Sequence, residues 1–204
     1  MTILQNWIAS YWPLVTQIVL GVLLFACAWI YLPLLWGALW LPAPLRIVKK
    51  MLRLADVQPG QTVVDLGAGD GRIVIAAALW FEARAVGVEI DPVRCLIAKT
   101  LIRLLGLRER ARVHYGNMYA FDLAGADVVT LYLWPKTNQR LRSRLIEQLQ
   151  PGAKVVCYKF PIYGWTPVAA GSGRHDQGIL VYEMGKSDPN LWAMLSEPET
   201  ETPC

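Results

Sequence analysis

The chain has 204 residues, of which 54% are hydrophobic and 18% charged, and its formal net charge is +4. This length suits one medium-sized domain with an added segment, and the charge is too small to indicate a nucleic-acid partner. Four cysteines without C-x-x-C spacing and only two histidines indicate neither a disulfide framework nor a zinc site, so we expect no bound metal.

The N-terminal segment is apolar and uncharged. No Asp, Glu, Lys or Arg occurs before Arg46, and residues 14–32 form an apolar run that can approach the roughly 30 Å hydrocarbon core of a bilayer. A cleaved signal peptide or a buried helix is the alternative, but no basic segment precedes the run and no A-x-A-like site follows it. We predict a membrane anchor over residues 1–45 with one transmembrane helix at 14–32.

Positive charges directly follow the predicted span. Arg46, Lys49, Lys50 and Arg53 lie close behind it, and no positive residue precedes it. Under the positive-inside rule, this distribution predicts a single-pass membrane protein with its C-terminal domain on the cytoplasmic side, or on the equivalent inner side of an organelle membrane. The lipid bilayer is therefore an expected partner.

Short β-branched runs alternate with segments of helical periodicity over residues 46–185. Helices are predicted at 45–57, 70–81, 91–107 and 135–150, and strands at 61–67, 83–90, 111–117, 126–134, 153–160 and 178–184. This alternation predicts an α/β fold, a Rossmann-like three-layer sandwich with a mostly parallel sheet that binds ligands beyond the carboxyl ends of its strands. The polar tail at 186–204 is predicted to be mobile.

The first strand leads into a glycine loop, VVDLGAGDGR at residues 63–72. Its glycines are spaced G-x-G-x-G, whereas a dinucleotide fingerprint reads G-x-G-x-x-G. Carboxylates at Asp65 and Asp70 would repel a pyrophosphate but would attract a cationic ligand without phosphate. S-adenosylmethionine carries an ammonium and a sulfonium group, so we predict that it is the cofactor.

The same loop resembles the first motif of class I methyltransferases. The resemblance implies that the loop backbone wraps the methionyl part of the cofactor and that Asp65 faces its ammonium group. Glu89, at the end of the next strand, can accept both ribose hydroxyls, whereas Asp91 is predicted to cap the following helix. The predicted cofactor-binding residues are Asp65, Gly67, Ala68, Gly69, Asp70, Gly71, Glu89, Asn117 and Met118, the last two near the adenine.

A narrower resemblance rests on WLPAPLRIVKKMLRL at residues 40–54 and KFPIYGW at 159–165. These segments resemble membrane-anchored lysine methyltransferases of mitochondria, which modify the ATP synthase c-subunit or the adenine nucleotide translocase, and their bacterial relatives. The resemblance implies a membrane-protein substrate and places 40–42 and Phe160-Pro161 near the active site. An arginine often precedes that phenylalanine, whereas this chain has Lys159.

The end of the fourth strand is the expected wall for the methyl acceptor. Tyr132, Trp134 and Pro135 are the candidate catalytic residues, with Leu133 between them. No general base is evident there, but aromatic rings can hold an amine by cation–π contact. The alternative is that the segment is simply a buried strand.

The sequence is also compatible with two other functions. The acceptor of the methyl group could be a membrane lipid or a quinone instead of a protein. The chain could also be a non-catalytic membrane protein that uses the fold for binding, although the intact glycine loop and Glu89 argue against this reading.

Overall fold

The computed structural model describes residues 2–35, 41–173 and 177–187, with the side chains of the first helix described at 10–25 and 27. The chain divides into two compact units, Met1–Leu41 and Pro42–Cys204. Their boundary falls slightly before the expected one at 45/46. Of the predicted tail, residues 188–204 lie outside the described residues, as does Trp40.

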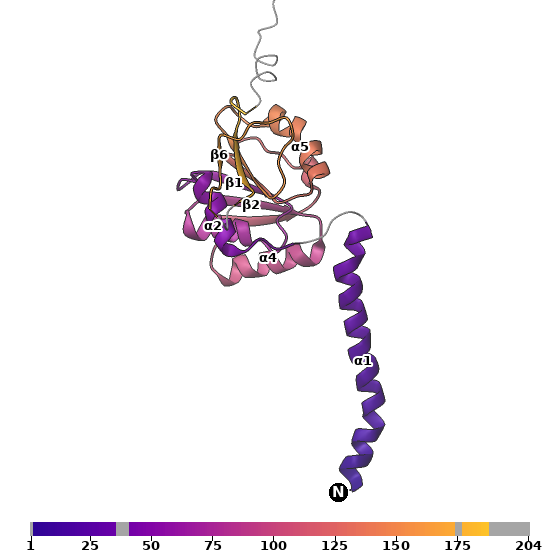
Figure 1. The fold of residues 1–204 in the computed structure, drawn as a ribbon. Coiled ribbons are helices and arrows are strands. Elements are labelled where there is room, and N and C mark those ends of the chain that lie inside the picture. Colours follow the sequence, from indigo (N-terminus) through magenta and orange to yellow (C-terminus); the bar gives the residue numbers. More distant parts are fainter. Residues whose placement is uncertain (1, 36–40, 174–176, 188–204) are drawn as a thin grey trace, which may run out of the picture. The chain divides into compact units, whose positions relative to one another are not determined.

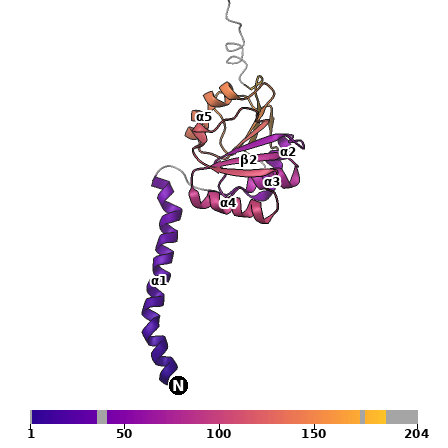
Figure 2. The ribbon, with the colours of Figure 1, turned by 180° about the vertical axis from the view of Figure 1, so that it is seen from behind.

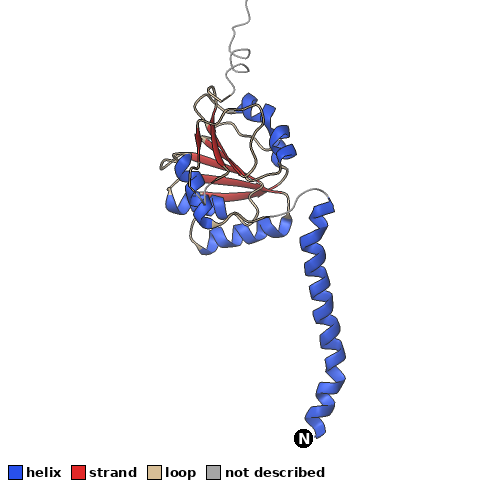
Figure 3. Cartoon of the chain, viewed as in Figure 1, coloured by secondary structure: helices blue, strands red, loops and turns tan. Residues whose placement is uncertain are grey.

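The first unit contains one continuous helix, α1, at Thr2–Leu35 (Figure 3). Its described apolar side chains are exposed on every side of the helix; they include Leu14, Val15, Ile18, Val19, Leu20, Val22, Leu23, Leu24 and Phe25. Within the described residues, no helix combines the length and the apolar character needed to cross a bilayer. The predicted span at 14–32 extends past the described side chains and stays a prediction.

The second unit is built on one seven-stranded sheet (Figure 1). Five strands are parallel: β1 Thr62–Leu66, β2 Arg84–Glu89, β3 Ala111–Tyr115, β4 Val128–Leu131 and β5 Lys154–Tyr158. β7 Ile179–Glu183 runs antiparallel beside β5, and the short β6 Ala169–Ala170 pairs with β7. The order β3-β2-β1-β4-β5-β7-β6 reverses direction between β1 and β4. Ligands bind at such a reversal in open α/β sheets.

Helices cover both faces of this sheet. α2 Leu45–Leu54, α3 Arg72–Trp80 and α4 Pro92–Leu104 pack on one face, and α5 Pro135–Gln148 packs on the other; a short 3-10 helix, η1, occupies Met118–Ala120 (Figure 2). Each face buries its own hydrophobic cluster against the β-branched residues of the strands. The predicted Rossmann-like three-layer sandwich with a mostly parallel sheet is therefore confirmed.

The start of α4 follows the sequence prediction. Asp91 is its N-cap, and its side chain accepts hydrogen bonds from the backbone N–H groups of Val93 and Arg94 at 2.9 and 3.0 Å. Pro92 occupies the first helical turn, where its missing N–H is harmless. The interpretation of Asp91 as a cap is confirmed.

The predicted strand at 126–134 is too long. β4 ends at Leu131, and residues 132–134 form a loop that leads into α5. Trp134 is extended because a residue before proline avoids the helical region, and Pro135 then begins the helix. The chain must also leave the sheet here to reach its other face. The candidate acceptor wall is therefore a loop at the carboxyl edge of the sheet.

Candidate functional site

The glycine loop joins β1 to α3 at the point where the strand order reverses. Gly67, Gly69 and Gly71 all have positive φ angles, of 82°, 56° and 79°. The backbone N–H groups of Gly67 and Ala68 both donate to the Val88 carbonyl of β2 at 2.9 Å. These bonds fix the loop across the ends of two neighbouring strands.

Close packing on both sides explains why two loop positions are glycine. A Cβ atom at Gly67 would lie 2.8 Å from Leu133 Cδ2, and one at Gly71 would lie 2.8 Å from Ala98 Cβ on α4. Both distances are shorter than any ordinary contact, and a positive φ also disfavours a side chain. The loop is therefore clamped between α4 and the residues that follow β4.

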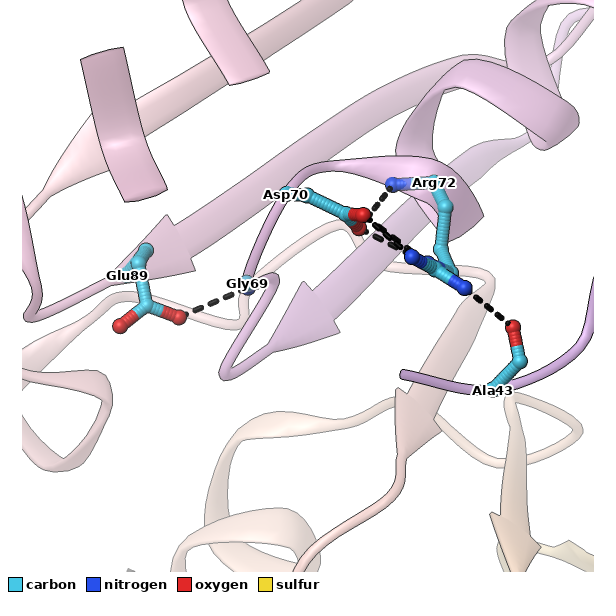
Figure 4. A network of polar contacts seen from close by, with 5 residues as sticks. All are labelled: Ala43, Gly69, Asp70, Arg72 and Glu89. Atoms are coloured by element: carbon cyan, nitrogen blue, oxygen red, sulfur yellow. Dashed lines mark hydrogen bonds and ion pairs between the residues drawn. The ribbon is translucent and has the colours of Figure 1, made fainter. Parts of the chain in front are cut away.

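Glu89 ties the end of β2 to this loop (Figure 4). Its Oε2 accepts the backbone N–H of Gly69 at 2.7 Å, and its Oε1 accepts the N–H of Asp91 at 2.8 Å. The residue is only 6% exposed. A carboxylate offers about four acceptor positions, so both oxygens keep capacity for ligand hydroxyl groups.

Asp65 is a buried acid behind the loop. Its Oδ1 accepts a hydrogen bond from Thr130 Oγ1 at 2.6 Å, and the parallel register of β1 and β4 places these two residues side by side. Burial raises the pKa of Asp65 to about 7, the Thr130 hydrogen bond opposes that rise, and the negative charges of Glu89 and Asp70 add to it. A cation bound nearby would favour the ionised form.

Asp70 is engaged by a neighbour in the same loop. Arg72 forms an ion pair and several hydrogen bonds with its carboxylate, and the same guanidinium donates to the Ala43 carbonyl at 2.8 Å (Figure 4). This pairing ties the segment before α2 to the glycine loop. A contact between Asp70 and the cofactor stays a prediction.

The two residues predicted near the adenine follow β3. Asn117 is exposed, and its side chain accepts the Tyr119 N–H at 3.0 Å, so it caps η1. Met118 is half-buried and packs against the hydrophobic cluster on the α5 side of the sheet. The Gly116 N–H donates to the Glu89 carbonyl, which keeps this turn next to the end of β2. Their contact with adenine stays a prediction.

These residues fit the predicted cofactor. Two buried acids lie at this loop: Glu89 accepts the Gly69 N–H, and Asp65 is close enough to Glu89 and Asp70 for their charges to raise its pKa. This arrangement suits a cationic ligand with hydroxyl groups better than a pyrophosphate, which the acids would repel. Among the described residues, no group of three or more His, Cys, Asp or Glu side chains could hold a metal ion.

The candidate acceptor wall is made of two aromatic pairs, each joining the segment after β4 to the end of β5 or the residues directly after it. Tyr132 lies against Tyr158 with ring centroids 4.9 Å apart, and Trp134 stacks on Phe160 at 5.4 Å and 19°. Lys159 Nζ lies 6.0 Å from the centroid of the Tyr132 ring. Leu133, between the two pairs, is the residue that contacts Gly67. The wall therefore adjoins the glycine loop.

A buried asparagine positions this wall, and the sequence prediction missed it. Asn138 on α5 is fully buried; its Nδ2 donates to the Phe160 carbonyl at 2.9 Å and its backbone N–H donates to the Trp134 carbonyl at 3.1 Å. It therefore links both halves of the stacked pair. Thr130 and Tyr158 were also missed. Of these residues, Thr130 could have been found from the sequence, because it is a polar residue inside the apolar run VVTLYL.

Comparison with known proteins identifies close relatives. Residues 65–169 match the model of a family described as the ANTKMT methyltransferase domain. A protein-lysine N-methyltransferase of Saccharolobus islandicus is 37% identical over 151 residues, which cover 72% of this chain and 94% of that protein. The adenine nucleotide translocase lysine N-methyltransferase of Mus musculus is 32% identical over 149 residues, which cover 73% of this chain but only 64% of the mouse protein.

A solved structure supports the cofactor. An RNA methyltransferase from Salinibacter ruber, in complex with S-adenosyl-L-homocysteine, is 41% identical and superimposes with a TM-score of 0.66. The match covers 71% of this chain and 92% of that one. S-adenosyl-L-homocysteine is what remains of S-adenosylmethionine after its methyl group has left.

Proposed function

Because the chain belongs to the ANTKMT methyltransferase domain family, we propose that this S-adenosylmethionine-dependent methyltransferase is a protein-lysine N-methyltransferase. The proposal rests on Leu133, which lies between the two aromatic pairs and packs against the glycine loop so closely that a Cβ at Gly67 would be 2.8 Å from its Cδ2. Aromatic rings can hold a lysine side chain and its cationic end. The identity with a lysine methyltransferase over almost its whole length supports the same acceptor.

Each element of the site has a defined task in this reaction. S-adenosylmethionine supplies an activated methyl group. Glu89 accepts the ribose hydroxyls, and Asp65 compensates the ammonium group behind the loop. The aromatic pairs align the acceptor amine, and orientation of this kind can lower a barrier by several kcal/mol. Since the wall contains no carboxylate or histidine, the acceptor ammonium gives its proton to water before methyl transfer. An apolar pocket and a nearby cation both lower the pKa of that ammonium and so favour the neutral amine.

We also propose that α1 anchors the enzyme in a membrane. Its described apolar side chains are exposed on every side, and leaving so many in water would be strongly unfavourable. The uncharged sequence before Arg46 and the basic cluster after it support a single-pass anchor with the catalytic unit on the cytoplasmic, or equivalent inner, side. The anchor would raise the effective concentration of targets in the same bilayer.

The proposed substrate is a lysine in a membrane protein. The mouse relative is named for such a target, the adenine nucleotide translocase, and an anchored enzyme would meet substrates of this kind directly. Because the chain spans only 64% of that relative, the name indicates a class of target and not this chain's own substrate.

RNA is the second candidate acceptor. The protein from Salinibacter ruber is described as an RNA methyltransferase, and this chain covers nearly all of it at 41% identity. The exposed Lys136 and Arg140 on α5 could contact phosphates. The stacked Trp134 and Phe160 rings could equally hold a base. The absence of a nucleic-acid partner, which we expect from the small net charge, therefore stays a prediction.

One experiment separates these acceptors. The purified full chain is incubated with methyl-labelled S-adenosylmethionine and membranes from its own source, and the product is divided into protease-sensitive, ribonuclease-sensitive and organic-soluble label. We expect protease-sensitive label that depends on the enzyme and disappears with Glu89→Ala. Label in the ribonuclease-sensitive fraction would establish the RNA alternative, and label in the organic phase would establish a lipid or quinone acceptor.

A further inference from the structure

α4 has two apolar faces, and only one of them is in the core. Cys95, Ala98 and Ile102 are buried against the sheet. On the opposite side, exposed apolar residues recur at helical spacing: Val93, Leu96, Ile97, Leu101 and Leu104. Leu96 is 64% exposed and Leu104 77%. A surface helix in water normally carries polar residues on its outer face. The apolar outer face of α4 therefore indicates contact with another apolar surface.

The exposed apolar surface continues onto α3. Leu79 and Trp80, at the end of α3, are 49% and 42% exposed. A pocket of about 350 Å³ lies between them and Leu101 of α4, with the first residue of α2, Leu45, on its rim. Asp70 and Arg72, which pair with each other, are its polar lining residues. We call the exposed surface of Leu79, Trp80, Val93, Leu96, Ile97, Leu101 and Leu104 the α3–α4 face.

The charged side chains on the helices of this face are all positive, and the neighbouring acids Asp70 and Asp91 are paired with Arg72 and Arg94. Helices α2, α3 and α4, which share this side of the sheet, contain no Asp or Glu; their cationic residues are Arg46, Lys49, Lys50, Arg53, Arg72, Arg94, Lys99 and Arg103 (Figure 2). Lys49 Nζ lies 5.4 Å from the Trp80 ring centroid. Lys99 and Arg103 are exposed among the leucines of α4. The charge therefore complements an anionic surface.

α5, on the other side of the sheet, provides the contrast. It is also basic, with Lys136, Arg140, Arg142 and Arg144, but none of its described residues is a large exposed apolar side chain. Basic residues therefore occur on the helices of both faces of the sheet. The combination of basic residues with an exposed apolar stripe is specific to the α3–α4 face among the described helices of the catalytic unit.

We propose that the α3–α4 face binds the interface of an anionic lipid bilayer. Apolar side chains on an outward helical face, a tryptophan and flanking lysine and arginine residues are the features of interfacial membrane-binding helices. The basic residues would meet lipid phosphates, and the leucines would reach the boundary with the acyl chains. Leu45, three residues after the start of the catalytic unit at Pro42, lines the pocket of this face. This contact is additional to the proposed α1 anchor and independent of the identity of the methyl acceptor.

The test measures contact with lipid directly and needs no activity assay. The full chain, with Cys27→Ser and Cys204→Ser, receives either Leu104→Cys on α4 or the matched control Lys136→Cys on α5, and each is labelled with an environment-sensitive dye. The remaining Cys95 and Cys157 are buried. The labelled chains are reconstituted with vesicles of phosphatidylcholine and phosphatidylglycerol in equal parts, some of which contain a nitroxide-labelled lipid.

We expect the dye at position 104 to shift to the blue and to be quenched by the nitroxide severalfold more than the dye at position 136. Reversing charge with Lys99→Glu and Arg103→Glu should reduce that quenching, as should high salt or vesicles of phosphatidylcholine alone. Equal quenching at the two positions would overturn the proposal, as would failure of the chain to float with the vesicles. A dye at position 104 shielded by a second copy of the chain, and not by lipid, would overturn it as well.

Discussion

Thr130 Oγ1 donates a 2.6 Å hydrogen bond to Asp65 Oδ1, so that a buried acid behind the cofactor loop is held by a residue of the neighbouring parallel strand. Burial raises the pKa of this acid to about 7 in spite of the hydrogen bond. Asp65 therefore titrates in the range in which the enzyme would work, and its charge can be coupled to the binding of a cation.

The binding of S-adenosylmethionine should depend on pH through Asp65. The ligand's ammonium group favours the ionised acid, so affinity should rise as the pH increases through about 7, and proton release should accompany binding below that value. Calorimetry in buffers of different ionisation enthalpy measures both effects. Asp65→Asn should remove this dependence, whereas Asp122→Asn, at an exposed carboxylate, should leave it intact.

The stability of the free chain should show the opposite trend. The pKa of Asp65 is about 7 in the fold but about 3.9 for an unfolded aspartate, so between these values the folded state binds more protons. Stability against urea should therefore fall as the pH rises from about 4 to about 7. If Asp65→Asn has the same slope over this window as the unmodified chain, the assignment is wrong.

Glu89→Gln tests the charge of the acid that we propose binds the ribose, with little change of side-chain shape. The variant loses a charge-assisted hydrogen bond to the ligand, which corresponds to about 1.5–3 kcal/mol, and its NH2 group can no longer accept the Gly69 or the Asp91 N–H. Cofactor binding should therefore weaken at least tenfold. Fluorescence or calorimetric titration measures this change. Glu82→Gln, at an exposed acid, is the control. Unchanged affinity in Glu89→Gln would exclude Glu89 from the cofactor site.

Gly67→Ala tests the contact between the cofactor loop and the acceptor wall. The substitution introduces both a strained positive φ, at about 1–2 kcal/mol, and a clash with Leu133. Gly60→Ala is a matched control because Gly60 has a similar φ, +81°, with nothing within 4 Å of the new Cβ. Methyl transfer should fall much further in Gly67→Ala, and adding Leu133→Ala should recover part of it. Equal effects of the two glycine substitutions would argue against this contact.

The stacked pair of Trp134 and Phe160 should serve the acceptor and not the cofactor. Trp134→Ala should lower kcat/KM for the acceptor by about 5- to 30-fold, since an aromatic cation contact is worth roughly 1–2 kcal/mol, while the affinity for S-adenosylmethionine stays nearly constant. Tyr163→Ala, which removes an exposed aromatic ring, is the control. An equal loss of affinity for S-adenosylmethionine would place Trp134 in the cofactor-binding part of the site.

Lys159 should influence the protonation of the acceptor. Its ammonium lies 6.0 Å from the Tyr132 ring, and a nearby positive charge disfavours a second one on the substrate lysine. Lys159→Met should therefore shift the pH profile of kcat/KM toward higher pH, and Lys136→Met, at an exposed lysine of α5, should not. A profile that stays in place, or moves toward lower pH, would contradict this role.

The sequence predicted the parts of the site that are encoded locally. The glycine spacing, the acids at 65 and 89 and the cap at Asp91 each lie within a few residues of the element they modify, so pattern and chemistry are adjacent in the chain. Glu89 could be related to the loop because both follow strands that end at the same edge of the sheet.

The missed residues depend on contacts between distant segments. Thr130 faces Asp65 only because β1 and β4 pair in one particular register, and Asn138 reaches Phe160 only because α5 packs beneath the end of β5. The end of β4 was misplaced because apolar residues 132–134 continue the pattern of a strand while Pro135 already begins a helix. Local propensity does not determine such tertiary contacts.

Tandem mass spectrometry of the reaction products shows whether this enzyme methylates lysine. Membrane proteins from its own source are incubated with S-adenosylmethionine and either the unmodified enzyme or Glu89→Gln, and every lysine-containing peptide is compared. We expect methylated lysines that appear with the unmodified enzyme and are strongly reduced with the variant. The absence of any enzyme-dependent lysine methylation, with methyl groups found instead on RNA or lipid, would contradict the proposed function.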